Sequence, residues 1–288
     1  MKHIPVLLNE TINILNPKKS KIYVDATFGL GGYTKAILDS SACNVIGIDC
    51  DKNTLMYADH IKQIYPQRFN FIKDNFKNID IILKNYNISN IDGIVFDLGF
   101  SSLQIEDVSR GFSFIKDGPL DMRMDRSLSL NAMYFVNQMT ERELSNLIYS
   151  FGGERKSRLI ARNIIQFREK RVIQSTKQLV KAIGVKQYND NIHFATRTFQ
   201  ALRIAVNSEL DNLKICLGKL PALLSKDATI SVVTFHSLED KIVKDFFNNC
   251  SHDKNFRKIN KKVITPNKKE IASNLRSRSA KLRGLKRI

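Results

Sequence analysis

The chain has 288 residues, of which 43% are hydrophobic and 26% charged, so its composition is that of a globular protein with one large core or two modest ones. Its net charge of +18 favours a polyanionic partner, either nucleic acid or an anionic membrane surface. No apolar run is long enough to span a bilayer, and Asn9 and Glu10 cut the N-terminal apolar stretch too short for a signal peptide.

The segment from Lys21 to Asp51 has the order strand, glycine turn, helix, strand, acid. This order predicts a parallel βαβ unit with strands at Ile22–Val24 and Val45–Ile48 and a helix from Tyr33 to Leu38. Before it, we expect the residues from His3 to Leu15 to be extended at first and then helical.

The turn of this unit predicts a cofactor that contains adenosine. Gly29, Gly31 and Gly32 let the backbone approach a ligand closely, and the helix that follows offers free N–H groups. Asp49, at the end of the second strand, suits a ribose diol. Asp25 would repel the pyrophosphate of a dehydrogenase cofactor, but it would attract the sulfonium and ammonium groups of S-adenosylmethionine. The alternative is an ordinary strand–turn–helix that binds no ligand.

Two more strands are expected in the same sheet. After a helix at Asp51–Ile64, the strand Phe69–Ile72 leads to Phe76, which either lies against an adenine ring or is a plain core aromatic. The strand Ile91–Phe96 is apolar apart from Asp92, so we expect it to be central.

A second group of chemically useful residues follows this central strand. Asp97 and Ser101 offer acceptors for the N–H groups of an exocyclic amine, and Phe100 offers a stacking face. Such groups suit a methyltransferase that aims the amine nitrogen at a sulfonium methyl. The alternative is a turn whose serine only caps the next helix.

From Glu106 to about Thr196 the sequence shows no strand pattern, which predicts a helical insertion in the α/β domain. Arg110–Met124 is irregular, but its Phe and Met residues favour an ordered loop. Capping boxes at Thr140–Glu143 and Ser175–Gln178 predict helix starts. The helix between them carries an arginine stripe that either faces water or contacts phosphates. The stripe consists of Arg155, Arg158 and Arg162.

Strand and helix patterns return after the insertion. Thr198–Leu217 predicts one long amphipathic helix, and Ala228–Phe235 predicts a strand. At the end of that strand, His236 either points into the site, where it would contact substrate, or lies beside a helix cap formed by Ser237 and Asp240.

The last segment, Ser251–Ile288, is strongly basic, with thirteen Lys or Arg against two acids. Such an excess favours contact with nucleic acid. We expect Ile259–Ile264 and Ala280–Ile288 to pair as an antiparallel hairpin, with a mobile basic loop at Asn267–Ser279 between them.

These patterns divide the chain into the first part of an α/β domain (1–105), an all-helical insertion (106–197) and the second part of the α/β domain (198–288). The cysteines show neither C-x-x-C spacing nor a histidine pattern. We therefore expect reduced cysteines in a cytoplasmic protein, without disulfides and without a metal site. The sequence does not predict the oligomeric state.

Eight stretches carry a resemblance to a known family. They are His3–Glu10, Asp25–Gly32, Asp97–Ser102, Arg110–Phe114, Asp117–Asp125, Ala195–Ala201, Arg203–Leu210 and Thr234–Asp240. Over essentially its whole length the chain resembles the bacterial small-subunit ribosomal RNA (cytosine-N4)-methyltransferases of the MraW type. The resemblance implies a class I S-adenosylmethionine-dependent methyltransferase fold, Rossmann-like, with a mostly parallel sheet and an inserted all-helical domain.

The resemblance also implies a reaction and a set of contacts. The methyl group of S-adenosylmethionine would pass to N4 of a cytidine in the decoding region of 16S rRNA, within the small ribosomal subunit. The implied cofactor contacts are Gly31, Gly32, Tyr33, Asp49, Phe76, Asp97 and Gln104. We expect the target cytosine to be unstacked and inserted near Phe100. Two positions depart from the family, since Tyr33 replaces a frequent histidine and Phe100 a frequent valine.

Two residues of the Asp97–Ser102 stretch are candidates for the chemistry. Asp97 and Ser101 are the candidate catalytic acceptors, and no general base is assigned. A DNA amino-methyltransferase is the first alternative, but it would show an Asp/Asn/Ser-Pro-Pro-aromatic turn where this chain has Asp97-Leu-Gly-Phe. A non-enzymatic RNA-binding protein is the second, and it would not explain a pocket of acids and glycines.

Overall fold

The structure is a computed structural model that describes residues 5–184, 193–252 and 254–288. The expectation for His3 lies outside the described residues. By its internal contacts the chain forms two compact units, unit 1 (Met1–Gly99 with Leu210–Ile288) and unit 2 (Phe100–Glu209). The division into domains at residues 105 and 197 stays a prediction.

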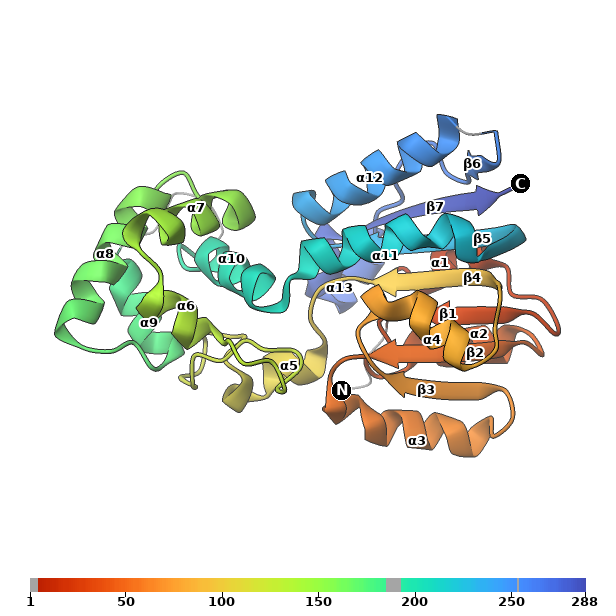
Figure 1. The fold of residues 1–288 in the computed structure, drawn as a ribbon, viewed down its shortest axis with the longest axis horizontal. Coiled ribbons are helices and arrows are strands. Elements are labelled where there is room, and N and C mark those ends of the chain that lie inside the picture. Colours follow the sequence, from red (N-terminus) through yellow and green to blue (C-terminus); the bar gives the residue numbers. More distant parts are fainter. Residues whose placement is uncertain (1–4, 185–192, 253) are drawn as a thin grey trace. The chain divides into compact units, whose positions relative to one another are not determined.

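Unit 1 is built on a seven-stranded sheet in the order β3-β2-β1-β4-β5-β7-β6 (Figure 1). Its strands are β1 (Ile22–Asp25), β2 (Asn44–Asp49), β3 (Phe69–Lys73), β4 (Ile91–Asp97), β5 (Leu224–Thr234), β6 (Phe256–Lys258) and β7 (Lys281–Arg287). Strands β1 to β5 are parallel, and β7 runs antiparallel to both β5 and β6. The strand order reverses between β1 and β4, where open α/β sheets bind ligands. β4 is central, as predicted.

Helices cover both faces of this sheet. Those of unit 1 are α1 (Leu8–Leu15), α2 (Gly32–Ser40), α3 (Leu55–Ile64), α4 (Ile79–Asn85), α11 (Glu209–Leu223), α12 (Ser237–His252) and α13 (Lys268–Ser273), with short 3-10 turns η1 (Lys52–Thr54), η2 (Phe76–Asn78) and η4 (Leu275–Ser279). Ile94 packs in a cluster with α4, α11 and α12, whereas Val95 packs with α2 and α3. Successive strand residues point to opposite faces, so buried apolar strands require helices on both sides. The α/β fold predicted from the sequence is confirmed.

The single helix predicted at Thr198–Leu217 is wrong. Two helices, α10 (Thr196–Asn207) and α11, are separated by Ser208, whose φ of 49° is left-handed. The Asn207 carboxamide donates to the carbonyl of Met122 at 2.8 Å, 85 residues away in the chain. This tertiary bond and the left-handed residue end α10 where the apolar pattern alone would continue it.

The predicted C-terminal hairpin is correct in part. β7 lies within the expected strand, but its partner is β6 and not Ile259–Ile264, of which Ile264 makes an isolated bridge to Leu282. The expected loop Asn267–Ser279 contains α13 and η4 instead. Asn267 and Asn274 start these two turns by accepting backbone N–H groups, and this is the cap chemistry that asparagine favours.

Unit 2 consists of helices joined by irregular loops and, among its described residues, contains no strand, as predicted for the insertion. Its elements are α5 (Ser102–Glu106), η3 (Val108–Arg110), α6 (Ala132–Gln138), α7 (Glu141–Gly152), α8 (Ser157–Lys170), α9 (Thr176–Ile183) and α10. The capping box at Thr140 is present in full. At Ser175 only half of the predicted box forms, because the Gln178 side chain accepts from the N–H of Gln174. The helices bury one apolar cluster of their own.

Candidate donor-binding site

Three acids end three neighbouring strands of unit 1. β1 pairs with β2 on one side and with β4 on the other, so Asp25, Asp49 and Asp97 lie at one edge of the sheet. All three strands present their carboxyl ends here, where the strand order reverses. The structure thus brings Asp49 and Asp97 together beside the glycine turn, which we define as Gly29–Gly32.

The glycine turn is closely packed against neighbouring side chains of unit 1. Gly31 is left-handed, with φ of 75°, and directly precedes α2. A Cβ atom on Gly31 would lie 2.3 Å from the Ile61 side chain, and one on Gly32 would lie 2.3 Å from the ring of Pro5. Neither position accepts a side chain without rearrangement, so the backbone itself forms the surface of the turn.

Asp49 is fixed by the turn that it faces. Its Oδ2 accepts the N–H of Gly29 at 2.7 Å, and its Oδ1 accepts the N–H of Asp51 at 2.8 Å. Burial raises the pKa of Asp49 to about 6, so the group is ionised at neutral pH. A carboxylate has about four acceptor sites. Each oxygen therefore keeps capacity for a further donor, and a ribose diol supplies two.

The Asp25 carboxylate is occupied by hydrogen bonds to neighbouring residues of unit 1. Its Oδ2 accepts both the N–H and the hydroxyl of Thr34, at 3.1 and 2.8 Å, and its Oδ1 accepts the N–H of Thr27 at 3.3 Å. The residue is fully buried. These bonds tie the end of β1 to the first turn of α2. Burial raises the pKa of Asp25 to about 6, so its negative charge persists at neutral pH and still opposes a pyrophosphate.

Asp97 differs from Asp25 and Asp49 in the hydrogen bonds that its carboxyl group accepts. Its Oδ1 is buried and, among the described residues, has no hydrogen-bond partner. Burial raises the pKa of Asp97 to about 8, and the charges of Asp25 and Glu239 add to the rise. A buried carboxylate oxygen without a partner is costly. A cationic ligand would remove this cost, so the residues present at this edge fit S-adenosylmethionine.

The side chains of Tyr33 and Phe76 both pack into unit 1. The Tyr33 hydroxyl donates to the carbonyl of Val6, and the ring is buried. Only the backbone of Tyr33 is therefore available to a ligand. The Phe76 ring meets Phe96 edge to face, with 5.7 Å between centroids, yet the residue stays partly exposed. It is a core aromatic with a free portion, so the two readings of Phe76 are compatible.

Ser101 and Gln104, in unit 2, cap a helix together. The Ser101 hydroxyl accepts the N–H of Gln104, and the Gln104 carboxamide oxygen accepts the N–H of Ser101 at 3.0 Å, which completes a capping box at the start of α5. The alternative reading of this serine as a cap is therefore confirmed. Its acceptor role in catalysis and the cofactor contact of Gln104 stay predictions.

Phe100 forms an aromatic surface within unit 2. It is 39% exposed, and its ring centroid lies 6.2 Å from that of Phe112. The Arg203 guanidinium lies 4.9 Å from the Phe100 ring centroid. That guanidinium is itself held by Glu209 through two bonds of 2.8 and 2.9 Å. Phe100 thus offers an exposed ring whose position is fixed by cation–π contact.

His236 caps α12, in place of the predicted pair Ser237 and Asp240. Its Nδ1 accepts the N–H of Glu239 at 3.3 Å, while the Glu239 carboxylate accepts the N–H groups of Phe235 and His236. Asp240 instead binds Arg283 of β7, at 2.7 Å. The prediction of a Ser237–Asp240 cap is wrong because the reciprocal pair His236 and Glu239 occupies the cap. Substrate contact by His236 stays a prediction.

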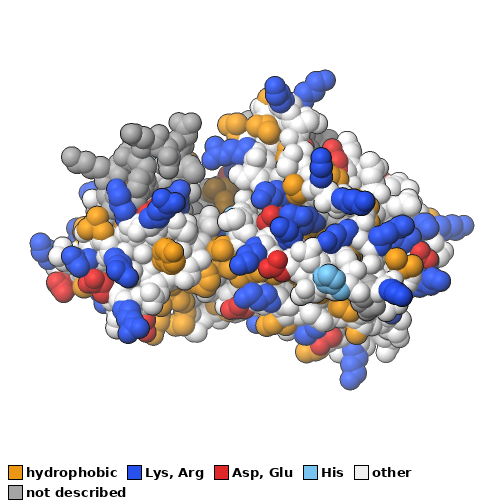
Figure 2. Space-filling view, turned by 90° about the horizontal axis from the view of Figure 1, so that it is seen from above, with side chains coloured by type: hydrophobic (Ala, Val, Ile, Leu, Met, Phe, Trp, Pro, Cys, Tyr) orange, Lys and Arg blue, Asp and Glu red, His pale blue; other side chains and the backbone are white. Residues whose placement is uncertain are grey.

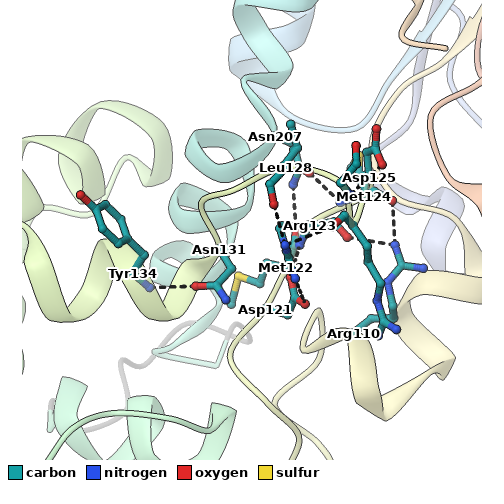
Figure 3. A network of polar contacts seen from close by, with 12 residues as sticks. Arg110, Asp121, Met122, Arg123, Met124, Asp125, Leu128, Asn131, Tyr134 and Asn207 are labelled. Atoms are coloured by element: carbon teal, nitrogen blue, oxygen red, sulfur yellow. Dashed lines mark hydrogen bonds and ion pairs between the residues drawn. The ribbon is translucent and has the colours of Figure 1, made fainter.

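A network in the loop before α6 was not identified from the sequence at the level of residues (Figure 3). Arg110 is almost fully buried and donates to the carbonyls of Arg123 and Met124, both at 2.9 Å. Asn207 on α10 accepts the N–H of Met124 at 2.7 Å, and Met122 is left-handed with φ of 62°. A buried arginine that binds carbonyls has no periodic signature, so only the prediction of an ordered loop was possible.

Comparison with known proteins agrees with this arrangement. The model of the MraW methylase family matches residues 1–288. The chain belongs to the MraW methylase family. "Ribosomal RNA small subunit methyltransferase H" of Ehrlichia canis (strain Jake) is 47% identical, over 99% of this chain and 100% of the relative. The protein of the same name from Wolbachia sp. subsp. Drosophila simulans (strain wRi) is 49% identical over 100% of both chains.

Membership of this family identifies the seven-stranded unit 1 as a methyltransferase core that uses S-adenosylmethionine. The strand order, with β7 antiparallel beside β5, is the class I methyltransferase fold that the resemblance implied. In the described part of the chain, no helix combines the length and the apolarity that crossing a membrane would demand.

Proposed function

We propose that this MraW methylase transfers the methyl group of S-adenosylmethionine to N4 of a cytidine in the decoding region of 16S rRNA. The observation that carries the donor assignment is the buried Oδ1 of Asp97 at the β1–β4 switch point, which no described residue binds. The substrate assignment is supported by the relatives that are named ribosomal RNA small subunit methyltransferases and by the net charge of +18. The small ribosomal subunit, in the cytoplasm, is the proposed partner.

Residues of unit 1 hold the donor in this proposal. Asp49 accepts the ribose hydroxyls with the acceptor sites that Gly29 and Asp51 leave open. Backbone groups of the glycine turn and of Tyr33 bind the methionine end, and the free portion of Phe76 packs on adenine. Asp97 takes the cationic part of the ligand, because its Oδ1 is the oxygen that lacks a partner among the described residues. Gln104 completes the proposed donor contacts.

When bound, S-adenosylmethionine supplies an electrophilic methyl group on a cationic sulfur. The N4 lone pair of cytosine is delocalised into the ring, so the enzyme gains most by orienting the amine for in-line attack. Asp97 and Ser101 are the candidate acceptors that hold the two N4–H bonds. The N4–carbon bond forms as the sulfur–carbon bond breaks, and one N4 proton leaves to an acceptor, either one of these residues or water.

The target cytosine must leave its stack before N4 is accessible. Phe100 is the proposed stacking surface, since its ring is 39% exposed and is held by Arg203. Stacking on one aromatic side chain contributes about 1–3 kcal/mol per base. His236 is the proposed second contact to the substrate, through its exposed portion.

The decisive experiment supplies labelled S-adenosylmethionine and small ribosomal subunits that lack the modification, and analyses the nucleosides. N4-methylated cytidine is the expected product. Label in another base, in protein or in DNA only would refute the substrate assignment while leaving the donor assignment intact. The Asp97→Asn enzyme is the control for donor use, because it keeps the size of the side chain and removes its charge.

A further inference from the structure

Apart from Lys258, which bonds to Asn248, the thirteen basic residues of the C-terminal segment fall into two groups. In β7, Lys281 and Arg283 bind Asp240, and Lys286 binds Asp227. Arg287 donates to the backbone carbonyls of Pro221 and Leu224. These four cations are therefore bound to acceptors within unit 1. The second group is exposed, and three of its members, Lys268, Lys269 and Arg278, make no ion pair with any residue that the structure describes.

Those three residues lie on the segment Asn267–Ser279, which we call the basic element. It consists of α13 and η4, each started by an asparagine cap. Besides its cations it exposes the apolar side chain of Leu275, at 71%. Lys and Arg side chains (blue) are widespread over the face shown in Figure 2, whereas acidic side chains (red) are fewer.

The basic element lies at the same edge of the sheet as the donor-binding acids. β7 begins after one intervening residue, Ala280, and Lys281, the first residue of β7, pairs with Thr234, the last residue of β5. Thr234 marks the carboxyl end of the parallel strands, so the basic element flanks the edge that carries Asp97. Figure 1 shows α13 at the side of the sheet to which the arrows of the parallel strands point.

The one acid of the basic element is used to anchor it. Glu270 accepts the N–H of Leu7 at 2.7 Å, and Leu7 is buried and left-handed, with φ of 52°. The preceding residues reach the glycine turn, because Val6 accepts the Tyr33 hydroxyl and Pro5 packs on Gly32. The chain of contacts from Glu270 to the start of α2 lies wholly within unit 1. Glu270 is thus held by the Leu7 N–H, and Lys268, Lys269 and Arg278 form no ion pair with any described residue.

An RNA that brings a base to this edge meets an electrostatic problem. The ionised carboxylates of Asp25 and Asp49 repel its phosphates, and charges act over about 8 Å at physiological salt. Cations beside the acids, but outside the pocket, solve the problem by binding the backbone while the base enters. We propose that the basic element docks the phosphate backbone of the substrate RNA beside the donor site, and that Glu270 positions it against the glycine turn. This inference rests on the proposed function.

The test compares two triple variants in binding to a 16S rRNA transcript. The first is Lys268→Gln, Lys269→Gln and Arg278→Gln. The matched control is Lys226→Gln, Lys254→Gln and Arg257→Gln, which also removes two lysines and one arginine that are exposed. These control residues lie toward the opposite edge, because Lys226 is near the start of β5 and Arg257 pairs with Lys286, which faces Thr229.

The expected result is a change in salt dependence. Single-stranded contacts contribute about 0.7 to the slope of log affinity against log salt for each phosphate. Loss of three contacts should lower the slope by about 2, which corresponds to an approximately 18-fold difference in salt sensitivity between 50 and 200 mM. The control should keep a slope closer to the wild-type value. Equal slopes for both triple variants would overturn the inference.

Two outcomes of the binding and methylation assays distinguish a failure of this inference from a failure of the proposed function. If wild-type enzyme binds the transcript with the expected slopes but does not methylate cytidine N4, the docking surface stands and the proposed reaction fails. If it methylates cytidine while the first triple variant keeps wild-type slope and KM for subunits, the docking surface fails and the reaction stands. S-adenosylmethionine affinity of the first triple variant should stay within twofold of wild type, which confirms that unit 1 is folded.

Glu270 needs a separate test as a positioning residue. Glu270→Ala should raise KM for ribosomal subunits about tenfold and weaken donor binding, because Leu7 loses its acceptor. Glu270→Gln keeps an oxygen for that N–H and should recover most of both losses. Equal defects in the two variants, or none in either, would contradict the positioning role.

Discussion

Donor binding should depend on the ionisation of Asp97. The pKa of this carboxyl is about 8 in the free protein because the group is buried near Asp25 and Glu239. At pH 7 the side chain is therefore mostly protonated and neutral. A cationic ligand beside Oδ1 favours the ionised form, so binding should release a proton and strengthen as the pH rises.

The size of the effect follows from the ionised fraction. With a pKa of about 8, roughly 9% of Asp97 is ionised at pH 7 and roughly 91% at pH 9, which is a tenfold difference. If only the ionised form binds the cation, Kd for S-adenosylmethionine should fall about tenfold across this range. Asp25 and Asp49 have pKa values of about 6, so they are already ionised and contribute little to the change.

Isothermal titration calorimetry of wild-type and Asp97→Asn proteins would measure this effect. The donor carries an α-amino group that titrates near pH 8, and the variant shares that background. The ratio of the two Kd values therefore isolates Asp97. The Kd of Asp97→Asn divided by the Kd of wild type should rise about tenfold from pH 7 to pH 9, because the variant binds the donor more weakly. A ratio that stays constant from pH 6 to pH 9 would refute the assignment of Asp97 to the cationic part of the donor.

Three more outcomes follow from the same geometry. Asp49→Ala should weaken donor binding about 10- to 100-fold by calorimetry, since hydrogen bonds to a charged group are lost; an unchanged Kd would remove the ribose assignment. Without donor, Asp97→Asn should melt at a higher temperature than wild type at pH 8.5 and at a similar one near pH 4. The reason is that an acid with a raised native pKa loses stability as pH rises from its unfolded pKa toward the native one; equal melting curves at pH 8.5 would contradict the burial of its charge. Phe100→Ala should lower kcat/KM on subunits about 5- to 100-fold with donor affinity unchanged, and unchanged kcat/KM would exclude stacking.

The sheet of unit 1 was predictable because its signals are local. Each of the first four strands is a short apolar run, and β1, β2 and β4 each end in an acid, so both the strands and the edge that they share follow from the sequence. The glycine turn was predictable for the same reason. The order β5-β7-β6 and the bounds of β6 depended on contacts between distant segments, and the sequence placed that strand several residues too late.

The chemistry of the site was less predictable than its position. Asp25 and Asp97 both follow apolar strands, yet one is saturated by Thr27 and Thr34 and the other has an oxygen without a partner among the described residues. This difference arises from where the hydroxyls and N–H groups lie in space. The cap formed by His236 was missed for a similar reason, since serine has the stronger cap preference and the histidine precedes it by one residue.

At the donor-binding edge of the sheet the buried charges are negative and the exposed charges of the basic element are mostly positive. In the proposed function the buried acids select a cationic donor, whereas the exposed Lys268, Lys269 and Arg278 of the basic element lie at the same edge. Salt distinguishes the two, because exposed charges are screened and buried ones much less so. Raising the ionic strength from 50 to 500 mM should therefore weaken RNA binding steeply while changing the Kd for S-adenosylmethionine by less than about twofold. If donor affinity fell as steeply as RNA affinity, the acids would have to be open to solvent, and the burial of Asp97 could not be the source of donor selection.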